Sequence, residues 1–167
     1  MSELSVNTND RIKHRCCFTG HRPEKLTRDI REIKDDLTKA IIHAMAEGKK
    51  VFISGMSRGI DLWAAEIVLS YKKQNSEIKL VCAIPFEEFN KQWSREWQLT
   101  YQKVLLAADW KKIFYSKFSY SAFQIRNQWM VDHSSLVIAA YNGKFGGTYN
   151  TLRYAFSLNK DIRIIKA

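Results

Sequence analysis

The fold of this chain is decided by Ser135-Leu-Val-Ile-Ala-Ala-Tyr-Asn-Gly-Lys-Phe-Gly-Gly-Thr-Tyr-Asn-Thr151, in which an apolar strand leads through glycines into a helix. Gly146 and Gly147 let the backbone approach a ligand closely, and Thr148 is suited to cap the helix that follows. Free amides at the N-terminus of a helix attract anions. This stretch therefore predicts a loop that holds a phosphate.

An earlier segment, Val51-Phe-Ile-Ser-Gly-Met-Ser-Arg-Gly-Ile-Asp61, repeats this arrangement of strand, glycines and helix. Two such loops at strand ends favour a ligand site more strongly than one. Asp61 at the start of the helix has two interpretations, because the helix dipole alone favours a carboxylate there and a ribose hydroxyl could also use it. The candidate site residues in this segment are Ser54, Gly55, Met56, Gly59 and Asp61.

Length and composition predict one globular domain. Of the 167 residues, 46% are hydrophobic and 26% charged, which excludes disorder as the main state. The longest apolar run, Leu136 to Tyr141, is too short to cross a bilayer, so no membrane partner is expected. The polar N-terminus lacks the pattern of a signal peptide. We expect residues 1–14 to form a flexible tail and residues 15–167 to form the domain.

The three cysteines favour a cytoplasmic protein without a metal site. Cys16, Cys17 and Cys82 all lie in predicted strands and do not have the spacing of zinc ligands. Buried thiols in a reducing compartment are the simplest interpretation. No cofactor is predicted with certainty, and the sequence leaves a homo-oligomer open.

The net charge of +10 is concentrated toward the C-terminus, where residues 101–167 contain ten basic and three acidic side chains. This excess occurs in the part of the chain that carries the loop before Thr148. Solubility accounts for it in one interpretation; an anionic small ligand or nucleic acid accounts for it in the other.

Strand-like and helix-like segments alternate along the chain. Helical spacing within residues 86–108 places several aromatic residues on one face, which is typical of a packed helix. The alternation predicts an α/β, single Rossmann-like domain, with a mostly parallel sheet and helices on both faces. The predicted strands are 15–19, 50–54, 78–84, 112–115, 135–140 and 162–165; the predicted helices are 27–47, 60–71, 121–132 and 149–158.

Ligands of such sheets bind beyond the carboxyl ends of the strands, near the point where the strand order reverses. His21 could stack on or donate to a phosphate, or it could cap the next helix. Arg126 could reach over the sheet edge toward the glycine loop, or it could be an ordinary surface arginine. The further candidates at this edge are Gly20, Arg22, Pro85, which is expected to end the third strand, and Asn127.

Five motifs, in order, resemble the YpsA-like branch of the SLOG superfamily, which also contains DprA and the "lysine decarboxylase-like" LOG phosphoribohydrolases. The resemblance runs from about Cys16 to the C-terminus and implies a Rossmann-like fold that binds nucleotides or molecules derived from them. The motifs are Thr19-Gly-His-Arg-Pro23, Ser54-Gly-Met-Ser-Arg-Gly-Ile-Asp61, Ile84-Pro-Phe86, Arg126-Asn-Gln-Trp-Met-Val-Asp132 and Gly146-Gly-Thr148.

The comparison with LOG enzymes concerns catalysis. Their helix motif begins with an arginine, which resembles Arg126, and their loop motif ends Gly-Thr-x-x-Glu, in which Gly-Thr resembles Gly147-Thr148. The glutamate position then falls at Thr151. A hydroxyl does not replace a carboxylate that stabilises an oxocarbenium-like centre or activates water. Hydrolysis of an N-glycosidic bond by the LOG mechanism is therefore not expected.

These observations predict a protein that binds a nucleotide-derived ligand such as ADP-ribose. One alternative is a LOG-like hydrolase of nucleoside monophosphates. A second alternative is binding of single-stranded DNA, as the resemblance to DprA implies and the net charge permits.

Overall fold

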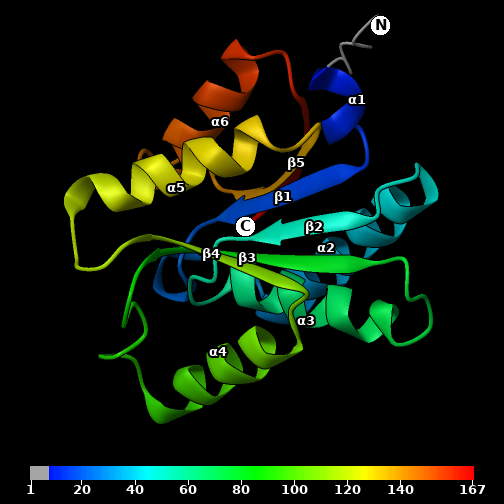
Figure 1. The fold of residues 1–167 in the computed structure, drawn as a ribbon. Coiled ribbons are helices and arrows are strands. Elements are labelled where there is room, and N and C mark those ends of the chain that lie inside the picture. Colours follow the sequence, from blue (N-terminus) through cyan, green and yellow to red (C-terminus); the bar gives the residue numbers. More distant parts are fainter. Residues whose placement is uncertain (1–7) are drawn as a thin grey trace, which may run out of the picture.

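Six parallel strands form one sheet in the order β4-β3-β2-β1-β5-β6 (Figure 1). The structure is a computed structural model that describes residues 8–167. The predicted α/β, Rossmann-like fold is confirmed, and every strand pairing in the sheet is parallel. The strands are β1 (Arg15–Gly20), β2 (Val51–Ser54), β3 (Lys79–Phe86), β4 (Trp110–Tyr115), β5 (Leu136–Tyr141) and β6 (Asp161–Lys166).

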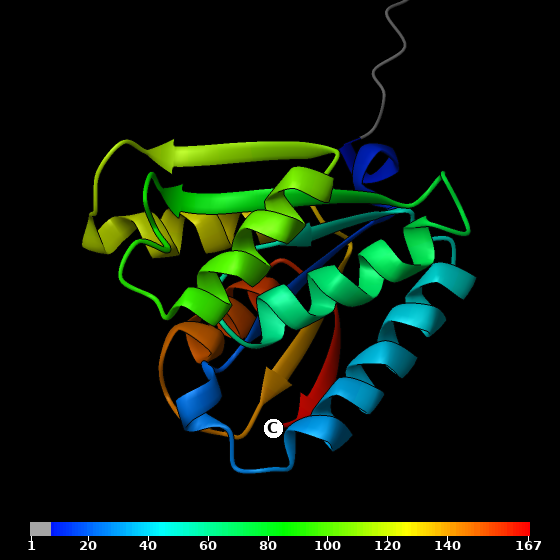
Figure 2. The ribbon, with the colours of Figure 1, turned by 90° about the horizontal axis from the view of Figure 1, so that it is seen from below.

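Helices cover both faces of this sheet. Helices α2, α3 and α4 lie on one face, and α5 and α6 lie on the other (Figures 1 and 2). A right-handed crossover between parallel strands produces this division, because the direction of travel through the sheet reverses after β4. The helices are α1 (Thr8–Ile12), the 3-10 turn η1 (Pro23–Lys25), α2 (Ile30–Ala46), α3 (Ile60–Lys72), α4 (Arg95–Ala107), α5 (Tyr120–Asp132) and α6 (Gly147–Ser157).

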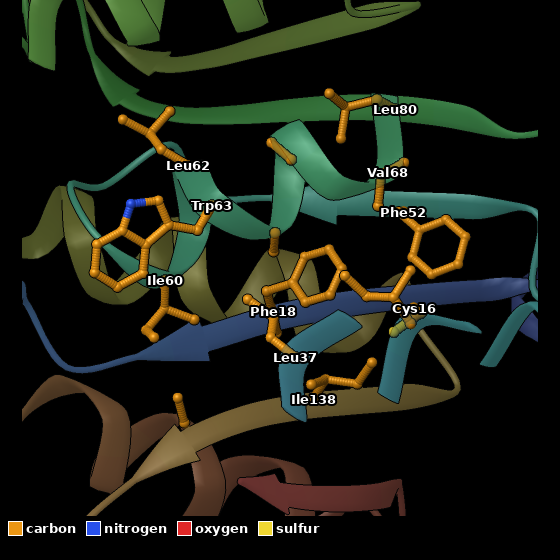
Figure 3. Close-up of a cluster of buried hydrophobic side chains, with 14 of the residues drawn as sticks. Cys16, Phe18, Leu37, Phe52, Ile60, Leu62, Trp63, Val68, Leu80 and Ile138 are labelled. Carbon is orange, nitrogen blue, oxygen red and sulfur yellow. The ribbon is translucent and has the colours of Figure 1, made fainter. Parts of the chain in front are cut away.

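The main core lies between the sheet and helices α2 and α3. Phe18 of β1 and Phe52 of β2 stack there with ring centroids 6.0 Å apart. Ile33, Leu37 and Ile41 of α2 are fully buried at helical spacing, which is why this segment forms an amphipathic helix. Figure 3 shows this apolar layer, to which both long helices and several strands contribute. All three cysteines are buried and free.

Strands β1 and β5 are neighbours in the sheet although three other strands, β2, β3 and β4, lie between them in the sequence. Their register aligns Thr19 with Ala139 and Gly20 with Ala140. The strand order reverses between them, so the loops after β1 and β5 diverge over opposite faces. Such a reversal opens a crevice at the carboxyl ends of the strands.

Three local predictions differ from the structure. Pro85 lies inside β3, whose pairing with β4 continues to Phe86 opposite Tyr115. Strand β2 ends at Ser54, opposite Cys82, so Pro85 lies where β3 has a paired neighbour on one side only, a position at which a strand tolerates proline. The aromatic stripe is helical only from Arg95 onward; Phe89 and Trp93 precede α4 in turns.

The third difference concerns the expected N-terminal tail. Residues 1–7 of that prediction lie outside the described residues. Thr8–Ile12 forms the short helix α1, and Ile12 is buried. Within the part of the chain that the structure describes, no helix is long and apolar enough to cross a membrane.

Candidate functional site

A cleft of about 380 Å³ opens at the carboxyl edge of the sheet, where β1 and β5 diverge. Its size falls in the ordinary range for small-molecule sites. It is bounded by the loop after β1, the start of α3, one side of α5 and the loop before α6. The predicted site residues that line it are Gly20, His21, Arg22, Asp61, Arg126, Asn127, Gly146, Gly147 and Thr148.

The N-terminus of α6 forms one end of the cleft. Gly146 precedes the helix with φ of 145°, a conformation that favours glycine. The first bond of the helix is donated by the Asn150 amide to the Gly146 carbonyl over 3.0 Å. The amides of Gly147 and Thr148 come before it and have no acceptor among the described residues. They are free to hold an anion.

Two threonine hydroxyls line the same cleft without a protein partner. Thr19 and Thr148 are 9% and 6% exposed, and neither side chain forms a hydrogen bond within residues 8–167. Their oxygen atoms stay accessible from the cleft, unlike Ser134 Oγ, which is buried and has no partner among residues 8–167. These two groups are therefore placed to accept or donate a bond from a ligand.

Positive charge dominates the wall that faces α6. The Arg22 guanidinium has neither a hydrogen bond nor an ion pair among the described residues, and Lys25 lines the cleft as well. Glu24 also lies in this wall, but it is engaged by Arg58, whose Nη2 is 3.1 Å from Oε1. The Arg22 charge remains available to an anion.

His21 is fixed in the wall of the cleft and does not cap a helix. Its ring stacks on Tyr141 with centroids 5.5 Å apart, and its Nε2 accepts from the Asn142 amide over 3.3 Å. Burial lowers the pKa of His21, and Lys25 and Lys144 lower it further. The imidazole is therefore neutral near pH 7, with Nδ1 carrying the proton.

Arg126 and Asp61 form the floor of the cleft, and both are buried. The Nη1 atom of Arg126 donates to the Gly55 carbonyl and, over 3.4 Å, to the Ala83 carbonyl. Its Nε donates to Asn127 Oδ1 over 2.8 Å. Arg126 therefore ties α5 to the ends of β2 and β3, and the alternative of an ordinary surface arginine is wrong.

Burial raises the pKa of Asp61 to about 6, and the nearby Arg126 limits this rise. The Asp61 Oδ2 accepts from the Ser57 amide over 3.2 Å. A side chain at position 55 would bring its Cβ to 2.8 Å from Arg126 Nη1 and 2.9 Å from Asp61 Oδ2. Gly55 therefore permits the two charged groups to approach each other.

Five residues predicted for the site do not line the cleft: Ser54, Gly55, Met56, Gly59 and Pro85. Ser54 is fully buried; its Oγ donates to the Asp61 carbonyl over 2.8 Å and accepts from the Met56 amide over 3.2 Å. Gly59 has φ of 89° and packs closely on Pro23. These residues shape the loop that presents Asp61.

The prediction also omitted residues that do line the cleft. Thr19 and Ser57 lie inside motifs that the sequence had already indicated, and Phe145 precedes the glycines of the loop. Phe123 lies three residues before Arg126 on α5, and this helical spacing could have identified it.

Thr151 does not supply an acid. It is buried, and its Oγ1 donates to the Gly147 carbonyl one turn earlier over 2.9 Å. It lines a smaller hollow of about 260 Å³ that shares Phe123, Asn127 and Gly147 with the cleft. Within residues 8–167, no group of three His, Cys, Asp or Glu side chains could hold a metal ion.

Comparison with known proteins places these features in a family. A model of the YspA SLOG family (YpsA) matches residues 16–163. The uncharacterized SPbeta prophage-derived protein YoqJ of Bacillus subtilis is 35% identical over 137 residues, which cover 74% of this chain and 80% of YoqJ. A UPF0398 protein of Levilactobacillus brevis is 29% identical over 112 residues, which cover 66% of this chain and 59% of that protein.

Two solved structures share the fold. DprA from Streptococcus pneumoniae superposes with a TM-score of 0.64 at 17% identity, over 96% of this chain and 52% of that one. DprA from Helicobacter pylori, described for its single-stranded DNA binding mode, superposes with a TM-score of 0.66 at 17% identity, over 97% of this chain and 69% of that one. The chain thus spans about half the length of the pneumococcal protein.

Proposed function

The chain belongs to the YspA SLOG family, and on that premise we propose that it binds a phosphate-bearing nucleotide such as ADP-ribose in the cleft between β1 and β5. The phosphate lies against the amides of Gly147 and Thr148. Arg22 neutralises its charge, and the Thr19 and Thr148 hydroxyls complete its hydrogen bonds. Asp61 lies on the side of the cleft where a ribose hydroxyl can bind.

The observation that carries this proposal is the convergence of unpartnered groups. Free amides, two threonine hydroxyls and an unpaired guanidinium all line one hollow at the reversal of the strand order. All of these groups are open to the cleft, so one ligand can reach them together. An anion with several acceptor oxygens satisfies them together.

Binding without hydrolysis fits the site better than LOG-like catalysis. The hydroxyl of Thr151 is used within its own helix, and Asp61 is the carboxylate on the floor of the cleft. Asp61 is held beside Arg126 and accepts a bond from the Ser57 amide, as an anchored structural carboxylate does. A nucleoside monophosphate hydrolase is therefore the second candidate.

Single-stranded DNA binding remains an alternative because the fold is that of DprA and the net charge is +10. Non-specific binding to a strand would weaken steeply with salt and require a minimum oligonucleotide length. A small nucleotide in the cleft would show neither property to the same degree.

Isothermal titration of ADP-ribose tests the proposal. Arg22→Ala should weaken binding by about 2 kcal/mol, the scale of a charge-assisted contact. Arg31→Ala is the matched control, because it removes the same charge from a side chain of α2 that is 90% exposed. Equal affinities for the two variants would contradict the proposed site.

A further inference from the structure

A second hollow adjoins the cleft, and its lining is aromatic. This aromatic groove, defined by Phe86, Trp93, Phe118, Tyr120 and Phe123, has a volume of about 900 Å³. It lies between the turns that precede α4 and the loop that joins β4 to α5. Its exposed rings, Phe118 and Tyr120, belong to none of the motifs recognised in the sequence.

The rings of the groove pack against one another at its base, and two of them are exposed to solvent. Phe86, at the end of β3, contacts Phe118 and Phe123 edge to face, with centroids 5.5 and 5.8 Å apart. Phe118 in turn contacts Tyr120 at 5.1 Å. Phe118 is nevertheless 56% exposed and Tyr120 is 90% exposed. Adjacent exposed aromatic rings on a rigid base form a surface on which a planar group can stack.

The groove and the cleft meet at two residues, since Arg22 and Phe123 line both. Arg22 is the residue proposed above to neutralise the phosphate. A ligand with its phosphate at α6 and an aromatic group beyond Arg22 would occupy both hollows. The groove is therefore placed to hold the part of the ligand that the cleft does not.

The charges of the groove fit the same type of ligand. Lys91 pairs with Glu88 at 3.2 Å and Arg58 pairs with Glu24 at 3.1 Å. Arg22 and Lys117 have no ion-pair partner among the described residues. Glu87 also lines the groove and has no ion-pair partner among the described residues, so the unpaired charges leave an excess of one cation. This excess favours an anion beside the rings, which a nucleobase joined to phosphate supplies.

We infer that the aromatic groove binds the nucleobase of the ligand whose phosphate occupies the cleft, with the base stacked against Phe118 and Tyr120. This inference rests on the proposed function and adds where the base of the nucleotide binds. The same chemistry is available from a free nucleotide or from one unit of a single strand. We assign it to the free nucleotide, because the groove and the cleft adjoin at Arg22 and Phe123, so that one small ligand can fill both.

The test compares ADP-ribose with ribose 5-phosphate, which has the phosphate but no base. The double variant Phe118→Ala/Tyr120→Ala should bind ADP-ribose roughly 10- to 100-fold more weakly, the range expected when a base loses its aromatic stack. Its affinity for ribose 5-phosphate should not change. Phe156→Ala, which truncates a 78% exposed ring on α6 outside the groove, should leave both affinities unchanged.

The outcomes separate the two proposals. Equal loss of both ligands in Arg22→Ala, with no effect of the double variant on ADP-ribose, would overturn the groove and retain the cleft. Failure of both ligands to bind the natural protein would overturn both proposals. A thymidine oligonucleotide that binds more tightly than ADP-ribose would overturn the assignment to a free nucleotide.

Discussion

Arg126 of α5 donates a hydrogen bond from Nη1 to the carbonyl oxygen of Gly55, which lies 71 residues earlier in the chain. This contact joins a helix on one face of the sheet to the loop that follows β2. Arg126 is 4% exposed and also borders the cleft. One side chain thus links the stability of the sheet edge to the geometry of the candidate site.

Arg126→Ala should lower the free energy of unfolding by about 3 kcal/mol, because it leaves the Gly55 carbonyl without its partner and removes the charge beside Asp61. Denaturant unfolding measures this loss. Arg153→Ala, at an exposed position of α6, should change it by less than about 0.5 kcal/mol. Similar losses in the two variants would show that the buried contacts of Arg126 contribute little.

Gly147→Ala should weaken ligand binding without lowering the stability of the fold. A Cβ at this position meets no atom within 4 Å, so the fold should retain its stability. The added methyl group enters the cleft beside the free amides and should weaken ADP-ribose at least tenfold. Gly146→Ala, with φ of 145°, should instead lose about 1 kcal/mol of stability or more. Unchanged ADP-ribose affinity in Gly147→Ala would place the phosphate elsewhere.

Affinity for ADP-ribose should rise about tenfold as the pH falls from 8 to 5. Burial raises the pKa of Asp61 to about 6, so its negative charge opposes an anion above that pH and disappears below it. Protonation of His21, whose pKa is lowered, acts in the same direction at the acidic end. The phosphates of ADP-ribose are diesters, which do not titrate in this range.

Asp61→Asn is the control for this pH dependence. It keeps an oxygen for the Ser57 amide and removes the titrating charge. Calorimetric titrations across the range should show a flatter profile for the variant, with the remaining slope due to His21. Identical profiles for the two proteins would rule out Asp61 as the titrating group.

The natural protein should not release base from nucleoside monophosphates at rates typical of enzymes. Thr151 stands where a LOG enzyme has its glutamate, and general acid or base groups contribute roughly 10²- to 10⁴-fold. Chromatography of the products, for the natural protein and for Thr151→Glu, decides the question. Rapid base release by the natural protein that is lost in Arg22→Ala would establish the hydrolase as the correct function.

The fold could be predicted because the local hydrophobic patterns indicate the same strands and helices that the sheet contains. Apolar runs such as Leu136 to Tyr141 indicated the strands, and an apolar stripe at helical spacing indicated a helix over 27–47. The helix itself begins at Ile30, because Asp29 caps it, and ends at Ala46. Pro85 misled the prediction because its cost depends on where the neighbouring strand ends. The point at which the neighbouring strand ends is a property of the whole sheet, and it cannot be obtained from the residues near the proline.

The site was predictable only in part, for a related reason. Glycines and charges at strand ends indicated the edge of the sheet where the cleft lies. The direction in which each side chain points depends on the conformation of the turn, which the sequence pattern does not reveal. Ser54 and Met56 are therefore buried beneath the cleft and do not line it. The aromatic residues between 86 and 108 keep a helical spacing even where the chain forms turns before α4. This spacing predicted a packed helix face and gave no sign of the aromatic groove. Phe86 and Phe118 meet there through the pairing of β3 with β4, a long-range contact that spacing does not reveal.

A crystal structure of the protein with ADP-ribose tests the central claim most directly. The account predicts a phosphate oxygen within hydrogen-bond distance of the Gly147 and Thr148 amides, with the Arg22 guanidinium beside it. Well-defined ligand density at another edge of the sheet, with these amides and Arg22 left without contact to it, would contradict the account.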